Sequence, residues 1–318
     1  MTVVVGILNK RGVSIAADSA TTHAVTHKLP NGDEVVDGFK IMNSGNKMLR
    51  LSDTMPVGIM IVNVAYILNI PWDVIIRWYR KKRGHLKFET VQDIATDFLD
   101  FVPEQNFFSG NSLSMKWNRE TELVFAGYGT NQKYPQLVYV KITGVSDNKL
   151  KYDPQEFQVC SISDEHESDI LYYGQKDITA MLTDDFGKKE EINDICNRVN
   201  NFFMRKKMEF VDKGLIDETA ECIPNFEKLI EEAYKERHQF MRQQWLDTVK
   251  DYSLQKMAGL AETLIRATEL YQNIMFQDET VGGLIDLAFI TREDGFQWLN
   301  RKSWYEPSKG GQYGKFGI

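Results

Sequence analysis

The chain has 318 residues, of which 42% are hydrophobic and 26% charged, and its 38 basic and 45 acidic residues give a net charge of −7. These proportions are typical of a soluble globular protein, and the acidic balance disfavours a general role in binding nucleic acid or an anionic membrane surface. The three cysteines are odd in number and lack zinc-ligand spacing, so neither a disulfide scaffold nor a cysteine-rich metal site is expected.

The sequence contains no segment that predicts membrane insertion or export. The longest apolar runs, such as Val57–Val64, are far too short to span a bilayer. The N-terminus lacks the basic region, apolar core and cleavage site of an export signal. We therefore expect a cytoplasmic protein without a membrane partner.

The first sixty residues predict β-strands. Thr2–Asn9 and Val13–Asp18 are β-branched and apolar, and a short turn separates them, which is typical of a hairpin covered on both faces. The segment His27–Asn46 is polar and contains three glycines, so we expect a loop there, with room for a small hairpin. Lys47–Leu51 and Val57–Asn63 predict the next pair of strands.

The middle of the chain predicts two helices, three strands and a further helix. The helices are expected at Ala65–Arg83 and Thr90–Val102, where apolar residues recur at helical spacing. The strands are expected at Glu122–Gly127, Gln136–Ile142 and Phe157–Ile162. The last helix is expected to begin near Gly174.

From Asp184 to about Tyr252 the charged residues become dense and helix formers dominate. An amphipathic helix at Phe226–Arg237 and an earlier one of the same kind are expected to pack as a helical hairpin. A helix at Leu254–Met275 and strands at Leu284–Thr291 and Phe296–Leu299 follow, before a tail rich in Gly, Ser and Pro. This order of elements indicates a layered α+β fold.

Thr2 follows the initiator methionine directly and opens an apolar strand. Removal of Met1 leaves a threonine whose own α-amine lies beside its hydroxyl. Such an amine has an unperturbed pKa of about 7.7–8.0 and can act as the base for the hydroxyl without a histidine. Thr-Val at an N-terminus is a weak signal by itself, and an ordinary second residue is the simpler explanation.

Four segments, in order along the chain, give this signal its support. They are Thr2–Ile7 with Gly12–Ser19, then Asn46–Leu51, Val57–Val62 and Asp278–Gly295. Together they resemble the opening hairpin, lysine strand, following strand and closing element of proteasome β subunits and their bacterial relatives among the N-terminal-nucleophile (Ntn) hydrolases. The chain is thus identified as a divergent bacterial-type member of that family with a helical insertion.

The resemblance implies a four-layer αββα sandwich, in which two antiparallel sheets face each other and helices cover both. It implies a proteasome-like domain formed by residues 1–183 and 253–303, a helical insertion at 184–252 and a tail at 304–318. In the family the neighbouring helices lie near ring–ring contacts, so the insertion is expected to alter assembly.

The resemblance also places four catalytic residues. Thr2 takes the position of the nucleophile, and Lys47 that of the lysine whose charge favours deprotonation of the hydroxyl. Asp18 matches the acidic partner of that lysine, and Asp278 the second acidic residue, which helps to hold the N-terminus. Burying the carboxylate of Asp18 at the end of an apolar strand without a partner would cost about several kcal/mol of folding free energy. Asp18 and Lys47 are therefore expected to pair.

Other positions retain or depart from the family pattern. Thr22 matches the threonine that lines the substrate cleft, and Asn63 stands at the oxyanion-hole glycine, where its backbone N–H can still donate. Gln175 and Val281 stand where serines are expected, and Ala20 replaces a basic residue. This loosened set of supporting residues predicts reduced or altered activity.

Three functions follow from the resemblance. The first is a threonine peptidase that cleaves polypeptides inside a homo-oligomeric ring or open helical assembly, to which an ATP-dependent unfoldase can deliver substrate. The second is a small-molecule amidase with the same mechanism, and the third a non-catalytic structural member. No cofactor is expected, and His23 and His27 lack a third ligand for a metal. The basic cluster Arg77–Arg83 is a helix end rather than a nucleic-acid site.

Overall fold

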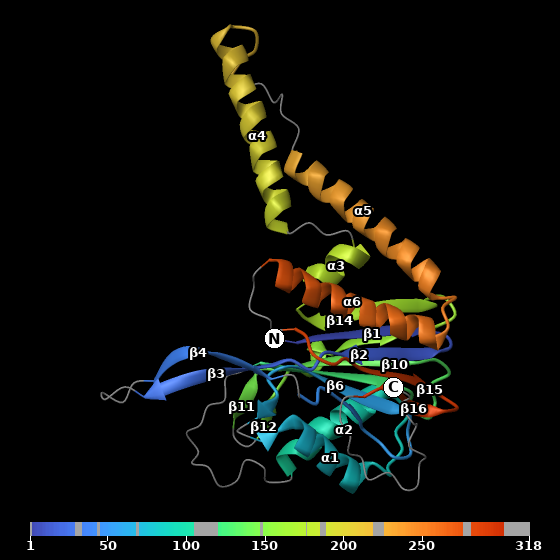
Figure 1. Ribbon diagram of the computed structural model, residues 1–318. Coiled ribbons are helices and arrows are strands. Elements are labelled where there is room, and N and C mark those ends of the chain that lie inside the picture. The colour runs from blue at the N-terminus through green and yellow to red at the C-terminus, as the bar shows by residue number, and fades with distance from the viewer. Residues whose placement is uncertain are drawn as a thin grey trace, which may run out of the picture.

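The computed structural model describes residues 2–28, 34–42, 45–67, 70–104, 120–146, 149–175, 177–184, 189–218, 226–275 and 281–301. Within these ranges the chain is a mixture of helices and strands, and its sheets are antiparallel. Figure 1 shows the strands in the middle of the molecule with helices on both sides of them.

The first five-stranded sheet contains the N-terminal hairpin at its centre. Its strands lie in the order β14-β1-β2-β15-β16. Their bounds are Ser168–Gly174 for β14, Val3–Asn9 for β1, Gly12–Ala17 for β2, Asp286–Thr291 for β15 and Gly295–Asn300 for β16. Every residue of β1 and β2 is buried, which explains why their sequences are apolar without alternation.

The second five-stranded sheet has the order β13-β10-β9-β6-β5. Its strands are Gln158–Ser161 (β13), Gln136–Ile142 (β10), Thr121–Gly127 (β9), Val57–Asn63 (β6) and Met48–Arg50 (β5). Three two-stranded ribbons complete the strands: Thr21–Lys28 with Glu34–Met42 (β3, β4), Tyr66–Ile67 with Ile70–Pro71 (β7, β8) and Gly144–Ser146 with Lys149–Lys151 (β11, β12).

Six helices are described. They are α1 (Trp72–Arg83), α2 (Val91–Glu104), α3 (Asp177–Asp184), α4 (Lys189–Asp212), α5 (Phe226–Val249) and α6 (Leu254–Ile274), with a short 3-10 turn at Pro154–Glu156. None of the helices in the described ranges combines the length and apolarity that crossing a bilayer requires.

Three hydrophobic clusters hold these elements together. One contains Val4 and Ile15 from the first sheet and Met60 and Val124 from the second, so the two sheets bury apolar side chains against each other. A second cluster packs α1 and α2 against the second sheet, and a third packs α6 against the first. Burial of apolar area on both faces of both sheets is therefore the main stabilising contribution.

Helices α4 and α5 contact each other and project from the rest of the molecule (Figure 1). The C-terminal part of α5 and the residues that follow it are tied to the first sheet. There Ser168 Oγ donates to the carbonyl of Leu246 at 2.6 Å, and Asn9 Nδ2 donates to the carbonyls of Val249 at 3.0 Å and Tyr252 at 2.9 Å. The end of α5 therefore lies beside β14 and the β1–β2 turn.

The structure corrects three of the element predictions. The helix predicted from Ala65 begins at Trp72, because Pro71 fixes an extended N-cap and the residues before it form β7 and β8. The segment His27–Asn46, expected as a loop with room for a small hairpin, contains β4 and the last two residues of β3, and these two strands pair with each other. Strand β14 was not predicted, although its sequence, Ser-Asp-Ile-Leu-Tyr-Tyr-Gly, is rich in strand-forming residues.

Candidate active site

Thr2 lies immediately before β1, at the end of the first sheet, and is 1% exposed. Its carbonyl accepts a hydrogen bond of 2.8 Å from the backbone N–H of Gln175. The next residue, Val3, is paired with Gly174 of β14 on one side. Thr2 is therefore held in position by its backbone, in the continuation of the β1–β14 ladder.

Asp18 follows β2 directly and is fully buried. Its backbone N–H donates to the carbonyl of Val3 at 3.2 Å, and its Oδ1 accepts from the N–H of Val3 at 3.0 Å. Its Oδ2 accepts from the N–H groups of Ala20 at 3.1 Å and Gly282 at 3.4 Å. Three backbone donors therefore satisfy this carboxylate, as a buried charge requires.

Lys47 precedes β5, and its backbone carbonyl accepts from the N–H of Ile61 in β6 at 2.8 Å. Its side chain is 5% exposed, and its Nζ donates to Oδ1 of Asp18 at 2.8 Å. One carboxylate oxygen thus joins the buried ammonium of Lys47 to the amide that follows Thr2. The structure brings together Thr2, Asp18 and Lys47, three of the residues that the sequence singled out.

Residues around Gly282 close the other side of this group. The carbonyl of Gly282 accepts from the N–H groups of Ser19 and Ala20, both at 3.1 Å. Ser19 is fully buried, and among the described residues its Oγ has no hydrogen-bond partner. This buried hydroxyl is a polar group of the candidate site that was not predicted from the sequence. The one feature of the sequence that could have indicated it is that Ser19 directly follows Asp18.

Asn63 ends β6 with a φ of 68°, in the left-handed region. It is the non-glycine residue with positive φ in the described part of the chain. Such a conformation is uncommon for residues with a side chain and tends to occur at functional positions. Its exposed Nδ2 donates to Oε1 of Glu122 at 2.8 Å, so the side-chain amide is directed to β9.

Two of the six expected site residues cannot be placed fully. Asp278 lies outside the described residues. Thr22 belongs to β3, opposite Ile41, but its side chain lies outside the described part. Of the two positions where serines were expected, Gln175 donates its backbone N–H to Thr2, and Val281 is buried with its N–H donated to Oε1 of Gln272 at 3.1 Å.

A cavity of about 400 Å³ runs along β14, and its lining residues do not include Thr2, Asp18 or Lys47. Gly174, the partner of Val3, lines one part of it, and so does Glu122, which binds Asn63. Tyr139 and Tyr173 also line it and stack with ring centroids 4.6 Å apart. Burial raises the pKa of both phenols, so their hydroxyls stay neutral, and the Glu122 carboxylate and the Arg242 guanidinium line the same cavity.

Gly174 ends β14 and lies against the carbonyl of Thr2. Its φ is +84°, and a Cβ built there lies 1.9 Å from the carbonyl oxygen of Thr2. We expect Gly174→Ala to lower the free energy of unfolding by about 1–3 kcal/mol, because the strained φ and the overlap both displace the Thr2 backbone. Denaturant titration measures this loss.

The matched control is Gly259→Ala in α6, where a Cβ meets nothing within 4 Å. This substitution is expected to stabilise the protein by up to about 1 kcal/mol, because alanine favours a helix over glycine. Equal effects of the two alanines would show that contact with Thr2 does not constrain position 174.

Chemically, the arrangement combines a hydroxyl, a buried ammonium and a carboxylate held by backbone donors. The ammonium already binds the carboxylate, which disfavours a metal ion at Asp18. A side-chain group with the ligand types for a metal lies elsewhere, around Asp169. The arrangement at Thr2 therefore suits nucleophilic chemistry that needs a fixed positive charge.

Comparisons with known proteins give similar structures but no family. No family model matches the sequence, and no curated protein matches it. Among solved structures, the chain is similar to Anbu from Hyphomicrobium sp. strain MC1 and to its (Gly-1) mutant, each with 13% identity and a TM-score of 0.44, covering 95% of this chain and 86% of that chain. It is also similar to Anbu, described as the ancestral β-subunit, from Yersinia bercovieri, with 11% identity and a TM-score of 0.43, covering 96% of this chain and 89% of that chain.

These comparisons correct the family assignment made from the sequence. The identification as a divergent proteasome β-subunit relative with a helical insertion is wrong as stated, because the similar structures are Anbu. The four matching segments are short and mainly apolar strands, a pattern that buried antiparallel sheets share. Identities of 11–13% with TM-scores below 0.5 assign neither a family nor an activity.

Proposed function

We propose that this chain is a threonine-type hydrolase that cleaves peptide bonds with Thr2 as its N-terminal nucleophile. The observation that carries the proposal is the position of Asp18, whose Oδ1 accepts from both Lys47 Nζ and the N–H of Val3. A lysine and an aspartate are rarely buried unless they are paired. Asp18 of this pair also binds the backbone N–H of Val3, the residue that follows Thr2.

In the proposed reaction, removal of Met1 frees the α-amine of Thr2. This amine accepts the hydroxyl proton while Oγ1 attacks the substrate carbonyl, and the same proton then leaves with the amine product. Water hydrolyses the resulting ester, with the α-amine again acting as base, and regenerates Thr2. The ammonium of Lys47 favours the developing alkoxide, and Asp18 holds that ammonium in place.

The remaining expected site residues have supporting roles in the proposal. The backbone N–H of Asn63 is the oxyanion donor, and its left-handed conformation supports a specialised role at the end of β6. Asp278 is the second carboxylate that holds the N-terminus, and Thr22 lines the substrate cleft. The cavity beside Gly174 and Glu122 supports binding of a substrate next to Thr2.

The proposed fold is a four-layer αββα sandwich. Its support is the cluster between the two sheets and the two clusters that pack helices on their outer faces. Residues 1–183 and 253–303 form this unit in the proposal, and α4 and α5 project from it (Figure 1).

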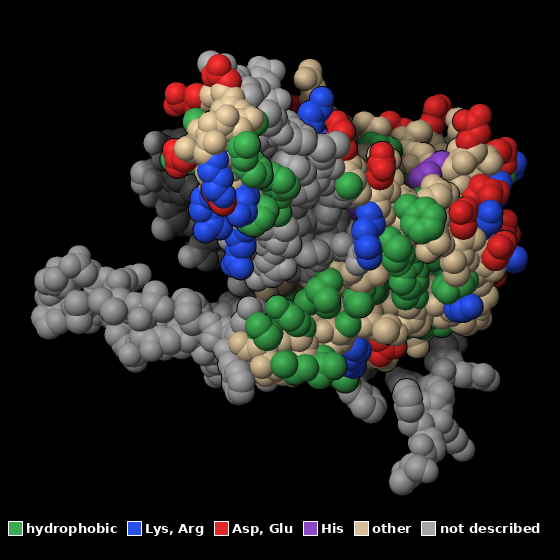
Figure 2. Space-filling view, turned by 90° about the horizontal axis from the view of Figure 1, so that it is seen from above, with side chains coloured by type: hydrophobic (Ala, Val, Ile, Leu, Met, Phe, Trp, Pro, Cys, Tyr) green, Lys and Arg blue, Asp and Glu red, His purple; other side chains and the backbone are tan. Residues whose placement is uncertain are grey.

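We further propose that the protein acts on polypeptides as a cytoplasmic homo-oligomer. Hydrophobic side chains gather on the face that α3, α4, α5 and α6 present, among charged residues (Figure 2). Among the described residues in and next to these helices, the hydrophobic side chains exposed by more than half are Met181, Met204, Met208, Leu215, Phe240, Leu270, Ile274 and Met275. Exposed apolar surface of this extent is typical of protein–protein contacts, and further copies of the chain are the proposed partners.

Native mass spectrometry of the untagged protein tests the proposal. We expect chains shorter by one methionine, assembled into a particle of several copies. An electrophile that acylates N-terminal threonine is expected to add one adduct per chain, and peptide mapping is expected to place that adduct on Thr2. Chains that retain Met1 and accept no adduct would contradict the nucleophile assignment and leave a non-catalytic role.

A further inference from the structure

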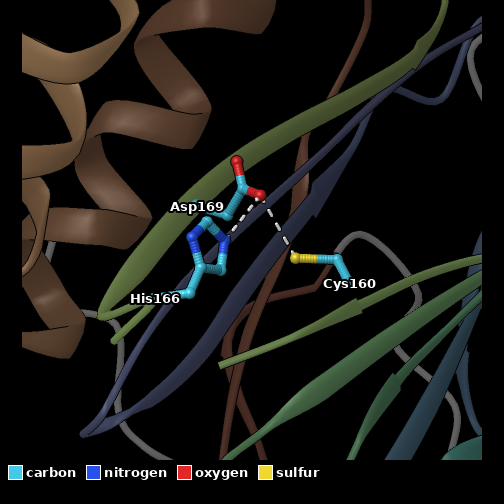
Figure 3. Close-up of side chains that lie close together, drawn as sticks. All are labelled: Cys160, His166 and Asp169. Atoms are coloured by element: carbon cyan, nitrogen blue, oxygen red, sulfur yellow. Dashed lines mark hydrogen bonds and ion pairs between the residues drawn. The ribbon is translucent and has the colours of Figure 1, made fainter. Parts of the chain in front are cut away.

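A second cluster of reactive side chains lies at the opposite end of β14 from Thr2. Cys160 belongs to β13, His166 to the connection after it, and Asp169 to β14 (Figure 3). One ligand atom from each, a sulfur, a ring nitrogen and a carboxylate oxygen, lies within 4.8 Å of the other two. The cluster connects the edge strand of one sheet to the edge strand of the other.

The two oxygens of Asp169 face different partners. Oδ2 accepts from Cys160 Sγ at 3.2 Å and lies 3.1 Å from His166 Nε2. Oδ1 accepts from Arg242 Nη2 of α5 at 2.6 Å and from the N–H of Ile170 at 2.8 Å. The second pair of contacts fixes the plane of the carboxylate and leaves Oδ2 directed at the sulfur and the imidazole, which is how outer contacts orient a metal ligand.

The backbone that carries His166 is also fixed. Ser163 Oγ accepts from the N–H groups of Glu165 at 3.3 Å and His166 at 2.9 Å, and the Ser163 N–H donates to the carbonyl of His166 at 2.9 Å. The neighbouring Ile162 is 5% exposed and packs in the cluster between the sheets. His166 is therefore presented by an ordered turn rather than by a free loop.

The spacing of the three ligand atoms suits a small tetrahedral ion. With zinc bond lengths of about 2.3 Å to sulfur and about 2.0 Å to nitrogen and oxygen, tetrahedral ligands lie about 3.5 Å apart for sulfur and oxygen and about 3.3 Å for nitrogen and oxygen. The observed separations of 3.2 and 3.1 Å differ from these by a few tenths of an ångström.

We propose that Cys160, His166 and Asp169 form a binding site for a zinc-class divalent cation, with water as the fourth ligand. Thiolate and imidazole are ligands that select zinc over magnesium and calcium. The His166 side chain is 43% exposed, which leaves an approach for the ion and its water. On binding, the Cys160 thiol becomes a sulfur–metal bond and its proton passes to the solvent, while His166 binds as neutral imidazole through Nε2.

The same geometry does not support a cysteine nucleophile. Such a site needs a histidine that takes the thiol proton, whereas here both Cys160 and His166 are directed at the carboxylate of Asp169. Burial and the Asp169 carboxylate also raise the pKa of the Cys160 thiol, so the thiolate does not form at neutral pH without an ion. A bound cation reverses this preference.

Binding tests this inference independently of any hydrolysis. Reduced, metal-free, untagged full-length protein is titrated with Zn²⁺ by calorimetry and with Co²⁺ by absorption. We expect one ion per chain, a sulfur-to-cobalt charge-transfer band, and a Tm raised by at least about 3 °C at saturating Zn²⁺, because only the folded chain assembles the ligands. Mg²⁺ and Ca²⁺ are expected to leave the Tm unchanged.

Two variants and their controls locate the ion. Cys160→Ser and His166→Ala are each expected to raise the Kd for Zn²⁺ more than about tenfold, and Cys160→Ser to abolish the charge-transfer band. The controls Cys196→Ser, Cys222→Ser and His85→Ala, which alters an exposed histidine after α1, are expected to bind as the wild type does. Absence of Zn²⁺ binding, or equal binding by His166→Ala, would overturn the site and leave a hydrogen-bonded tie between β13, β14 and α5.

Discussion

Thr2→Ala is expected to lower the rate of peptide hydrolysis by at least about 10³-fold, which is the order of magnitude expected when a covalent nucleophile is removed. The reason is that alanine offers no hydroxyl, while the α-amine, Lys47 and Asp18 all remain. The fold is expected to persist, because the interaction that holds residue 2 is the hydrogen bond between its carbonyl and the N–H of Gln175. Cleavage of a fluorogenic peptide library measures the rate, and thermal unfolding checks the fold.

Thr2→Ser is the matched control for the nucleophile. Serine keeps a hydroxyl beside the α-amine, so its rate is expected to stay within about tenfold of the wild type. Both variants need the same mass measurement, since retained Met1 would abolish activity for a different reason. Hydrolysis at the wild-type rate in Thr2→Ala with Met1 removed would show that another group carries the reaction.

Breaking the Asp18–Lys47 pair is the second change with a large expected effect. Asp18→Asn leaves the buried ammonium of Lys47 without its counter-charge and is expected to lower the free energy of unfolding by about 3–5 kcal/mol. Lys47→Met is expected to cost less, about 2–3 kcal/mol, because three backbone N–H groups still bind the Asp18 carboxylate. Both variants are expected to lose hydrolysis, since each removes part of the charge arrangement beside Thr2.

A double-mutant cycle separates the pair from its surroundings. Asp18→Asn with Lys47→Met removes both charges, so its loss of stability is expected to be smaller than the sum of the single losses, with a coupling of at least about 1 kcal/mol. Denaturant titration of all four proteins gives the cycle. The matched control is Lys206→Met on α4, where an exposed ion pair with Glu209 at 2.7 Å is expected to contribute nothing measurable. Additive losses at Asp18 and Lys47 would mean that the two charges do not stabilise each other.

Local sequence patterns were sufficient for much of the fold. Seven elements lie close to their predicted ranges, because the pattern of apolar residues within each segment indicates its secondary structure. They are the strands β1, β2, β6, β9 and β10 and the helices α2 and α6. The helix expected from Ala65 began later because one proline outweighed the pattern. β14 was missed although its sequence is rich in strand-forming residues.

One part of the candidate site can likewise be predicted from local sequence, and another part cannot. The short turn after Asn9 sets the register in which Val4 opposes Ala17, so the hairpin itself brings Asp18 beside Val3 and the end at Thr2. The hairpin alone is therefore enough to predict that Asp18 lies beside the strand end that carries Thr2. Lys47 is different, because it reaches Asp18 from another sheet and only the packing of the two sheets brings them within 2.8 Å.

The sequence by itself determined the strand hairpin, the acidic residue at its end and the threonine that opens it, because these depend on neighbours along the chain. Only the tertiary structure decided that Asn63 adopts a left-handed conformation beside Glu122 and that Asp169 collects Cys160, His166 and Arg242. Those contacts join separate strands and a helix. Their geometry is set by long-range strand order and by how α5 packs on β14, and neither is encoded in the spacing of the residues involved.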